Sequence, residues 1–262
     1  MNSLPVYNSL PDKPKSKEYK LNIRSFSTVT ETAASAAADI AGFIRKNPGC
    51  LLCLAAGDTP LPVFKSLVYI QSKGEVDLNS AFYVGLDEWV GLGRDTEGSC
   101  AQVMYDEFYI PAGIKQERIC AWDGKNTDMK AERQRIEAWI LLHGGISLAL
   151  LGIGMNGHIG FNEPNTGLPE GTVFVVLDDT TKKVSIKYFK KELPIEYGIG
   201  IGAGELKKAR KLILIATGSI KAEIVKKAVS DGQDEAVPAS LLTDHNDITL
   251  YIDAGAASMI KA

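Results

Sequence analysis

Short apolar runs alternate along this chain with longer stretches of helical character. Cys50–Leu54, Ala81–Leu86 and Ser147–Leu151 have the length and hydrophobicity of strands that are buried on both faces. Helical segments alternate with such runs. One example is the alanine-rich stretch Glu31–Lys46, which precedes the strand Cys50–Leu54 and has high helix propensity. Because strands that alternate with helices form parallel sheets, we predict a three-layer, Rossmann-like α/β fold in which helices cover both faces of a largely parallel sheet.

The other predicted elements continue this alternation. The further strands are Tyr19–Phe26, Thr172–Leu177, Tyr197–Ile201, Lys211–Ala216 and Ile248–Ile252, and the further helices are Leu61–Lys73, Ser99–Phe108, Met129–His143 and one that begins near Ile220. No linker divides the chain, and 262 residues that are 45% hydrophobic can bury one sizeable core. We therefore predict a polar N-terminal arm at 1–18 and a single domain at 19–262.

The composition argues against several classes of partner. The net charge is −3 and the pI is near 5.7, and no basic block is present, so we expect no binding to nucleic acid or to an anionic membrane. No apolar run is long enough to span a bilayer and the N-terminus is polar, which favours a cytoplasmic protein. We expect the partner to be a small molecule.

The four cysteines fit the same interpretation. Cys50 and Cys53 have CxxC spacing, but no second pair or histidine follows at zinc-finger spacing. We interpret them as buried thiols in preference to a metal or redox site. We assign no function to Cys100 and Cys120, and we expect no metal and no cofactor.

The stretch Leu150–Pro164 holds the strongest candidate for a catalytic side chain. Its glycines and polar residues are Gly152, Gly154, Gly157, Gly160, Asn156, His158, Asn162 and Glu163. His158 is suited to proton transfer near neutral pH, and Asn156 and Glu163 are natural partners that fix its tautomer and charge. A lone loop histidine is more often a hydrogen-bonded turn residue, but these neighbours favour a functional one. His143 has a structural explanation at a helix end.

A candidate anion site follows the strand Cys50–Leu54. The loop Ala55–Pro60 leads into a helix, so its free N–H groups and the helix macrodipole can bind phosphate. The alternative is an ordinary turn in which Asp58 or Thr59 caps the helix. Asp58 is a complication, because a carboxylate that points into a phosphate site repels the ligand. Lys221, in the first turn of a later helix, either binds an anion or is simply solvated.

Two acids follow the strand Ala81–Leu86. Asp87 and Glu88 are adjacent on an extended chain, so their side chains point to opposite sides and do not form a dyad. We expect one of them to face the cleft and the other to be structural, while two ordinary surface acids are the alternative. Ligands of open α/β sheets bind at the carboxyl ends of strands, which favours the first interpretation.

Four motifs resemble one known family in order and spacing. They are LAAGDTPLPVFKSL, FYVGLDEWVGL and LLGIGMNGHIGFNEP, with TGSIKAEIV as a weaker fourth. The chain resembles the glucosamine-6-phosphate deaminase/isomerase family, which is related to the 6-phosphogluconolactonases, from about Tyr19 to Ala257. HIGFNEP is specific to the deaminase branch, and lactonases tend to carry arginine where this chain has Trp89.

The resemblance implies a role for each matched residue. For phosphate binding, it implies the amides of Gly57, Asp58 and Thr59, assisted by Lys221 and Lys187. For catalysis, it implies that Asp87 moves a proton from carbon 2 to carbon 1 of the sugar and that His158 opens the ring, while Glu163 and Asn156 orient that histidine and tune its pKa. It implies substrate contacts for Glu88 and Gly157. The implied reaction converts glucosamine 6-phosphate and water to fructose 6-phosphate and ammonia without a metal. It also implies that the two proton-transfer roles fall on two different strand ends.

The chain departs from the family pattern at four positions: Asn156 replaces aspartate, Asp58 glycine, Lys187 arginine and Gly200 threonine. These departures leave galactosamine 6-phosphate as an alternative substrate. A lactonase and a sugar-phosphate-binding protein without turnover also stay open, whereas a sensor attached to a DNA-binding domain does not fit, because too few residues precede Tyr19. A homo-oligomer, allosteric control and a hinge at Pro164–Gly171 are further open possibilities.

Overall fold

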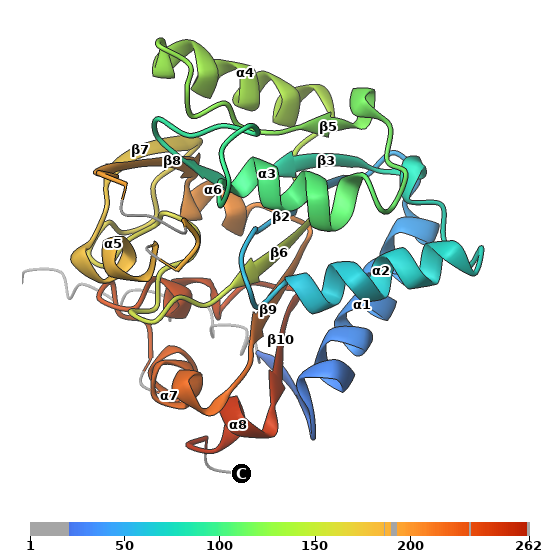
Figure 1. The fold of residues 1–262 in the computed structure, drawn as a ribbon. Helices are drawn as coiled ribbons and strands as arrows, with labels where there is room; N and C mark the ends of the chain where they lie inside the picture. The colour runs from blue at the N-terminus through green and yellow to red at the C-terminus, as the bar shows by residue number, and fades with distance from the viewer. Residues whose placement is uncertain (1–20, 186, 190–192, 231, 261–262) are drawn as a thin grey trace, which may run out of the picture.

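A seven-stranded, all-parallel sheet forms the centre of the computed structural model, which describes residues 21–185, 187–189, 193–230 and 232–260 (Figure 1). The strand order is β1-β10-β9-β6-β2-β3-β5. The strand bounds are Asn22–Phe26 (β1), Leu51–Leu54 (β2), Phe82–Gly85 (β3), Ile119–Cys120 (β5), Leu148–Gly152 (β6), Lys211–Ala216 (β9) and Ile248–Asp253 (β10). The predicted α/β architecture is confirmed. The predicted arm at 1–18 lies outside the described residues.

The direction in which the chain winds reverses between β2 and β6. From β2 the strands proceed through β3 to β5 at one edge, whereas from β6 they proceed through β9 and β10 toward the other edge. β2 and β6 are themselves hydrogen-bonded neighbours, with Cys53 opposite Ala149. Loops that follow two such strands diverge to opposite faces and leave a crevice at the carboxyl edge. The fold therefore brings the loop after β2 and the loop after β6 to the two sides of one crevice.

Helices cover both faces of this sheet (Figure 1). Their bounds are Val29–Lys46 (α1), Leu61–Ser72 (α2), Cys100–Met104 (α3), Met129–Leu142 (α4), Asp179–Ser185 (α5), Ala203–Lys207 (α6), Ala222–Ser230 (α7) and Ala254–Ala257 (α8). α1 and α2 pack on the side of Leu52 and Leu54, and α4 and α7 pack on the side of Leu51 and Cys53. The inner strands β2, β6, β9 and β10 are thus buried on both faces, as their apolar sequences require, whereas the edge strand β1 stays largely exposed.

A second, antiparallel sheet corrects the single-sheet expectation. β4 (Asp87–Trp89), β8 (Tyr197–Ile201) and β7 (Thr172–Val176) form a three-stranded sheet in the order β4-β8-β7. In its described part, the segment between β7 and β8 contains only the short helix α5. The two strands pair directly and antiparallel, and are not joined by a parallel β–α–β crossover. The small sheet matters for the site because its edge strand β4 begins at Asp87, directly after β3.

Local helix signals agree with the structure at some ends and not at others. Thr28 caps α1 in a capping box with Glu31. The cap residue of α2 is Pro60, with no side-chain cap, so the alternative in which Asp58 or Thr59 caps this helix is wrong. The predicted helix Ser99–Phe108 is α3 followed by one π-helical turn, Tyr105–Tyr109. No helix in the described ranges is long and apolar enough to cross a membrane.

Asn162 joins the loop after β6 to the small sheet. Its side-chain amide donates to the carbonyls of Ile159 and Ile201, both at 2.9 Å, and its Oδ1 accepts from the N–H of Ala203 at 2.7 Å. The residue is 1% exposed. The Ile159 carbonyl also accepts from the Asn162 backbone N–H at 3.0 Å, so the side-chain amide matters most for the Ile201 carbonyl and the Ala203 N–H.

We expect Asn162→Ala to lower the free energy of unfolding by about 2–4 kcal/mol, because it leaves buried carbonyl and N–H groups without partners. Urea unfolding followed by circular dichroism measures the change. The exposed Asn246 supplies the control, since Asn246→Ala is expected to change stability by less than about 0.5 kcal/mol. Equal small effects in both variants would show that Asn162 does not join the two parts.

Candidate active site

A cavity of about 610 Å³ opens at the carboxyl edge of the large sheet. The loop after β2 forms one wall with Ala55–Leu61, and the loop after β6 forms another with Gly152–Met155 and His158. Asp87 lies at the end of β3, and Thr217 and Lys221 follow β9. The cavity therefore occupies the crevice at which the winding of the chain reverses.

His158 lies at the cavity wall with its side chain 21% exposed. Gly154 makes this position possible, because a Cβ on Gly154 would lie 2.3 Å from His158 Nε2. The loop closes on itself through the Gly154 N–H, which donates to the His158 carbonyl at 2.9 Å. A glycine at 154 is thus required by the imidazole that packs on it, not by an unusual backbone angle.

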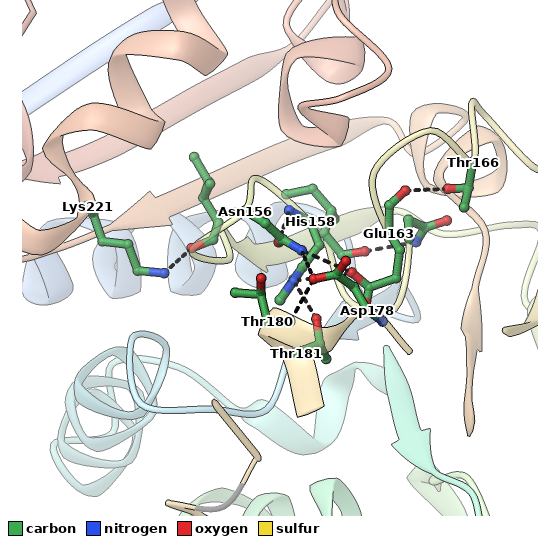
Figure 2. A network of polar contacts seen from close by, with 11 residues as sticks. Asn156, His158, Glu163, Thr166, Asp178, Thr180, Thr181 and Lys221 are labelled. Carbon is green, nitrogen blue, oxygen red and sulfur yellow. Dashed lines mark hydrogen bonds and ion pairs between the residues drawn. The ribbon is translucent and has the colours of Figure 1, made fainter. Parts of the chain in front are cut away.

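Polar side chains support the other ring nitrogen of His158 (Figure 2). Nδ1 lies 3.2 Å from Thr181 Oγ1 and 3.7 Å from Glu163 Oε2. The Asn156 amide donates at 3.3 Å to Glu163 and also to Asp178. Glu163 is 4% exposed, so its carboxylate is held behind the ring and away from solvent. This arrangement fixes the ring orientation and can stabilise an imidazolium once one forms.

Burial keeps His158 neutral. Desolvation, with a further contribution from the positive charge of Lys221, lowers the pKa of His158 to about 4, while Asp178 acts in the opposite direction. At neutral pH the imidazole therefore presents one donor and one acceptor nitrogen.

Asp87 lies in the same cavity, and its neighbours are unusually close. A Cβ on Gly160 would lie 2.9 Å from Asp87 Oδ2, and one on Gly200 would lie 3.0 Å from Asp87 Cβ. Burial raises the pKa of Asp87 to about 7, with a smaller contribution from the negative charge of Glu163. The carboxylate is therefore a stronger base than an ordinary aspartate. Gly200 stands where the family pattern has threonine, and its missing side chain leaves space for Asp87.

Glu88 does not lie in the cavity. Its carboxylate accepts hydrogen bonds from the N–H groups of Trp89, Cys100 and Ala101 at 2.8–3.0 Å, and the residue is fully buried. The first part of our expectation, one acid toward the cleft and one structural, agrees with this geometry. The prediction that Glu88 contacts substrate does not, because its carboxylate binds the N-terminus of α3 on the other side of the strand.

The far half of the cavity has the features of an anion site. Among the described residues, the N–H groups of Gly57, Asp58 and Thr59 have no protein acceptor. Lys221 donates to the Ile153 carbonyl at 2.6 Å, and burial, with repulsion from Lys187, lowers the pKa of Lys221 to about 8 (Figure 2). Lys187 lies 2.6 Å from Asp58 Oδ2. Unpaired amides and two lysines suit a phosphate.

Most of the predicted site residues come together in this cavity. Those that line it are Gly57, Asp58, Thr59, Asp87, His158, Lys187 and Lys221. Asn156 and Glu163 lie behind the His158 ring. Gly157 does not line the cavity, because it is buried against Val237 and uses its positive φ of 86° for the turn, so its predicted substrate contact is corrected.

The site also contains residues that were not predicted. Asp178 and Thr181 reach His158 and its partners from the start of α5, and Tyr188 lies beside Gly57. The run Asp178–Thr181 has the acid and hydroxyl residues of a helix start, which is the only local signal for it. Cys100, to which we assigned no function, lines the cavity with Asp87. Within the described residues no cluster of three or more histidine, cysteine or acidic side chains could hold a metal ion.

Comparisons of the sequence and of the structure with known proteins both find glucosamine-6-phosphate deaminases among the relatives. A family model described as glucosamine-6-phosphate isomerases/6-phosphogluconolactonase matches residues 25–251. A glucosamine-6-phosphate deaminase of Thermoanaerobacter sp. (strain X514) is 37% identical over 88% of this chain and 91% of its own length. One of Clostridium novyi (strain NT) is 34% identical over 92% of this chain and its full length.

Two solved structures are informative. A monomeric glucosamine-6-phosphate deaminase superposes with a TM-score of 0.87 and 32% identity, covering 91% of this chain and all of that one. A 6-phosphogluconolactonase from Leishmania guyanensis has a TM-score of 0.73 at 18% identity, covering 92% of this chain and 99% of that one. The second likeness shows the fold alone.

We expect His158 to titrate near pH 4 and to stay neutral between pH 6 and 8 in nitrogen-15 NMR of the imidazole. Lys221→Met removes a nearby positive charge, so it is expected to raise the pKa of His158. His158→Gln assigns the signal among the three histidines. A lower pKa in Lys221→Met would contradict the charge distribution described above.

Proposed function

Because the chain belongs to the family of glucosamine-6-phosphate isomerases and 6-phosphogluconolactonases, we propose that it is a glucosamine-6-phosphate deaminase. The reaction converts glucosamine 6-phosphate and water to fructose 6-phosphate and ammonia. One observation carries the assignment of roles: a carboxylate with a raised pKa and a neutral histidine line one cavity that has an anion site at its other end.

The substrate phosphate binds at the loop after β2. Gly57, Asp58 and Thr59 precede the N-terminus of α2 and line the cavity, so their amides can bind the phosphate, and Lys221 and Lys187 supply positive charge. With the phosphate there, the sugar extends toward Asp87 and His158 along the same cavity. The phosphate contacts thus position the reacting carbons before any proton moves.

His158 opens the sugar ring. Its neutral imidazole accepts the proton of the anomeric hydroxyl and returns a proton to the ring oxygen, which gives the open-chain aldehyde. Glu163 lies 3.7 Å from Nδ1 and stabilises the positive charge that develops on the ring during transfer. Asn156 and Asp178 hold Glu163 and complete this support.

Asp87 carries the isomerisation. Its carboxylate takes the proton from carbon 2, the carbon that bears the amine, and returns it to carbon 1. The product of this transfer is a ketimine, whose carbon–nitrogen bond is hydrolysed by water to the ketose and ammonia. A base with a pKa near 7 suits this step, because near neutral pH it is ionised in a large fraction of molecules and still has a higher proton affinity than an ordinary aspartate.

The cavity fits a lactonase less well. Trp89 stands where lactonases of this family tend to have arginine. Its ring packs against Phe161 and Phe189, with ring centroids 4.7 and 5.6 Å away. An aromatic side chain in that place cannot bind a carboxylate or phosphate by a guanidinium. Galactosamine 6-phosphate, which differs at carbon 4, is the second substrate to be assayed.

We expect Asp87→Asn to lower kcat by about 10³-fold, because the amide cannot accept the carbon-bound proton. Ammonia release from glucosamine 6-phosphate and, separately, galactosamine 6-phosphate measures turnover, and calorimetry measures binding, which should persist. The matched control is Asp95→Asn, in an exposed ion pair with Lys125. Near-normal ammonia release from Asp87→Asn would remove Asp87 from the mechanism.

We expect kcat/KM to rise with pH as Asp87 ionises near pH 7 and to fall as Lys221 loses its proton near pH 8. The signs follow from the roles, since the base must be deprotonated and the phosphate ligand must be charged. Lys221→Met should raise KM about 10- to 100-fold and abolish the alkaline fall. An effect of this variant on kcat alone would argue against the phosphate role.

A further inference from the structure

Asp58 is an acid inside the anion half of the cavity. Its carboxylate lies 2.6 Å from the amine of Lys187, and the two side chains are 63% and 51% exposed. Both residues line the cavity, Asp58 from the loop after β2 and Lys187 from the segment after α5. The Asp58 carboxylate therefore forms an ion pair with Lys187 inside the space in which a phosphate would bind.

The two residues that follow Lys187 are packed against the rest of the protein, whereas the Lys187 side chain is long and half-exposed and can change partner. The next residue, Tyr188, presses its carbonyl on Gly98, where any Cβ would clash, and its hydroxyl lies near Gly57. Phe189 is 2% exposed and packs on Trp89. A long lysine side chain on a fixed backbone can turn from one anion to another.

Among the residues that the structure describes, no lysine other than Lys187 forms an ion pair with Asp58. The Lys221 amine instead donates to the Ile153 carbonyl at 2.6 Å. Asp58 acts on Lys221 only through its charge, which raises the pKa of Lys221 while Lys187 lowers it. Lys183 also lines the cavity, from α5. The ion pair between Asp58 and Lys187 is exposed and therefore weak, so a dianion that also binds the loop amides can replace the carboxylate.

We propose, resting on the function proposed above, that Asp58 competes with phosphate for Lys187 and so weakens the binding of phosphate at this site. Binding of the sugar phosphate transfers Lys187 from the Asp58 carboxylate to the phosphate oxygens. The sugar contacts with Asp87 and His158 offset the loss of the ion pair. Free inorganic phosphate must break the same ion pair without those contacts, so its affinity is lower than it would be without Asp58.

Binding of inorganic phosphate to the full chain, measured by isothermal titration calorimetry at low salt, tests this. We expect Asp58→Asn to lower the Kd about fivefold, because it removes a competitor of the size of an exposed ion pair. In protein that also carries Lys187→Met, Asp58→Asn should lower the logarithm of the phosphate Kd by less than half as much. Asp247→Asn is the control, since it removes an acid paired with Lys211 at the amino edge of the sheet.

Each outcome decides the proposal. A Kd that is unchanged or higher in Asp58→Asn, or equally lowered by Asp247→Asn, would overturn it. An equal gain with lysine and with methionine at 187 would also overturn it, because Asp58 would then act by long-range repulsion alone. Failure of the proposed function is distinguishable, because it would show as an absence of ammonia from either amino sugar whatever the phosphate Kd does.

Discussion

The pairing of β2 with β6 is the constraint on which the rest of the molecule depends. Parallel strands need crossovers, and from this pair the crossovers run to opposite edges of the sheet. The loop with the free amides and the loop with His158 therefore meet at one carboxyl edge, although about a hundred residues separate them in the sequence. Asp87 joins them because β3 is the other neighbour of β2.

Desolvation gives the cavity its acid–base character. The same burial acts with opposite signs on the two central groups: it lowers the pKa of His158 and raises that of Asp87. The two groups are thus brought to protonation states that suit proton transfer near neutral pH. Polar residues behind the ring, above all Glu163, keep the imidazole oriented without being exposed themselves.

The site could be predicted where a residue acts through its own chemistry and the local pattern around it. Asp87, His158 and Lys221 follow strands in sequence, and all three line the cavity. Glu88 could not be separated from Asp87 in this way, because the partner that takes up its carboxylate is the N-terminus of α3, a contact set by packing. Cys100 and Asp178 reach the site from elements whose position no local pattern reveals.

The sequence by itself determined six of the seven strands of the large sheet and the long helices α1, α2 and α4, because apolar runs and helix signals are local and their burial follows from hydrophobicity. The two-residue strand β5 was not predicted, since it is too short to carry such a pattern. The sequence also determined the loop chemistry, since glycines and polar residues stand next to those strands in the chain. Only the tertiary structure decided that β4, β7 and β8 form a separate antiparallel sheet and that Asp58 meets Lys187. Strand partners and contacts between distant segments depend on which surfaces pack together, and that is a property of the whole chain.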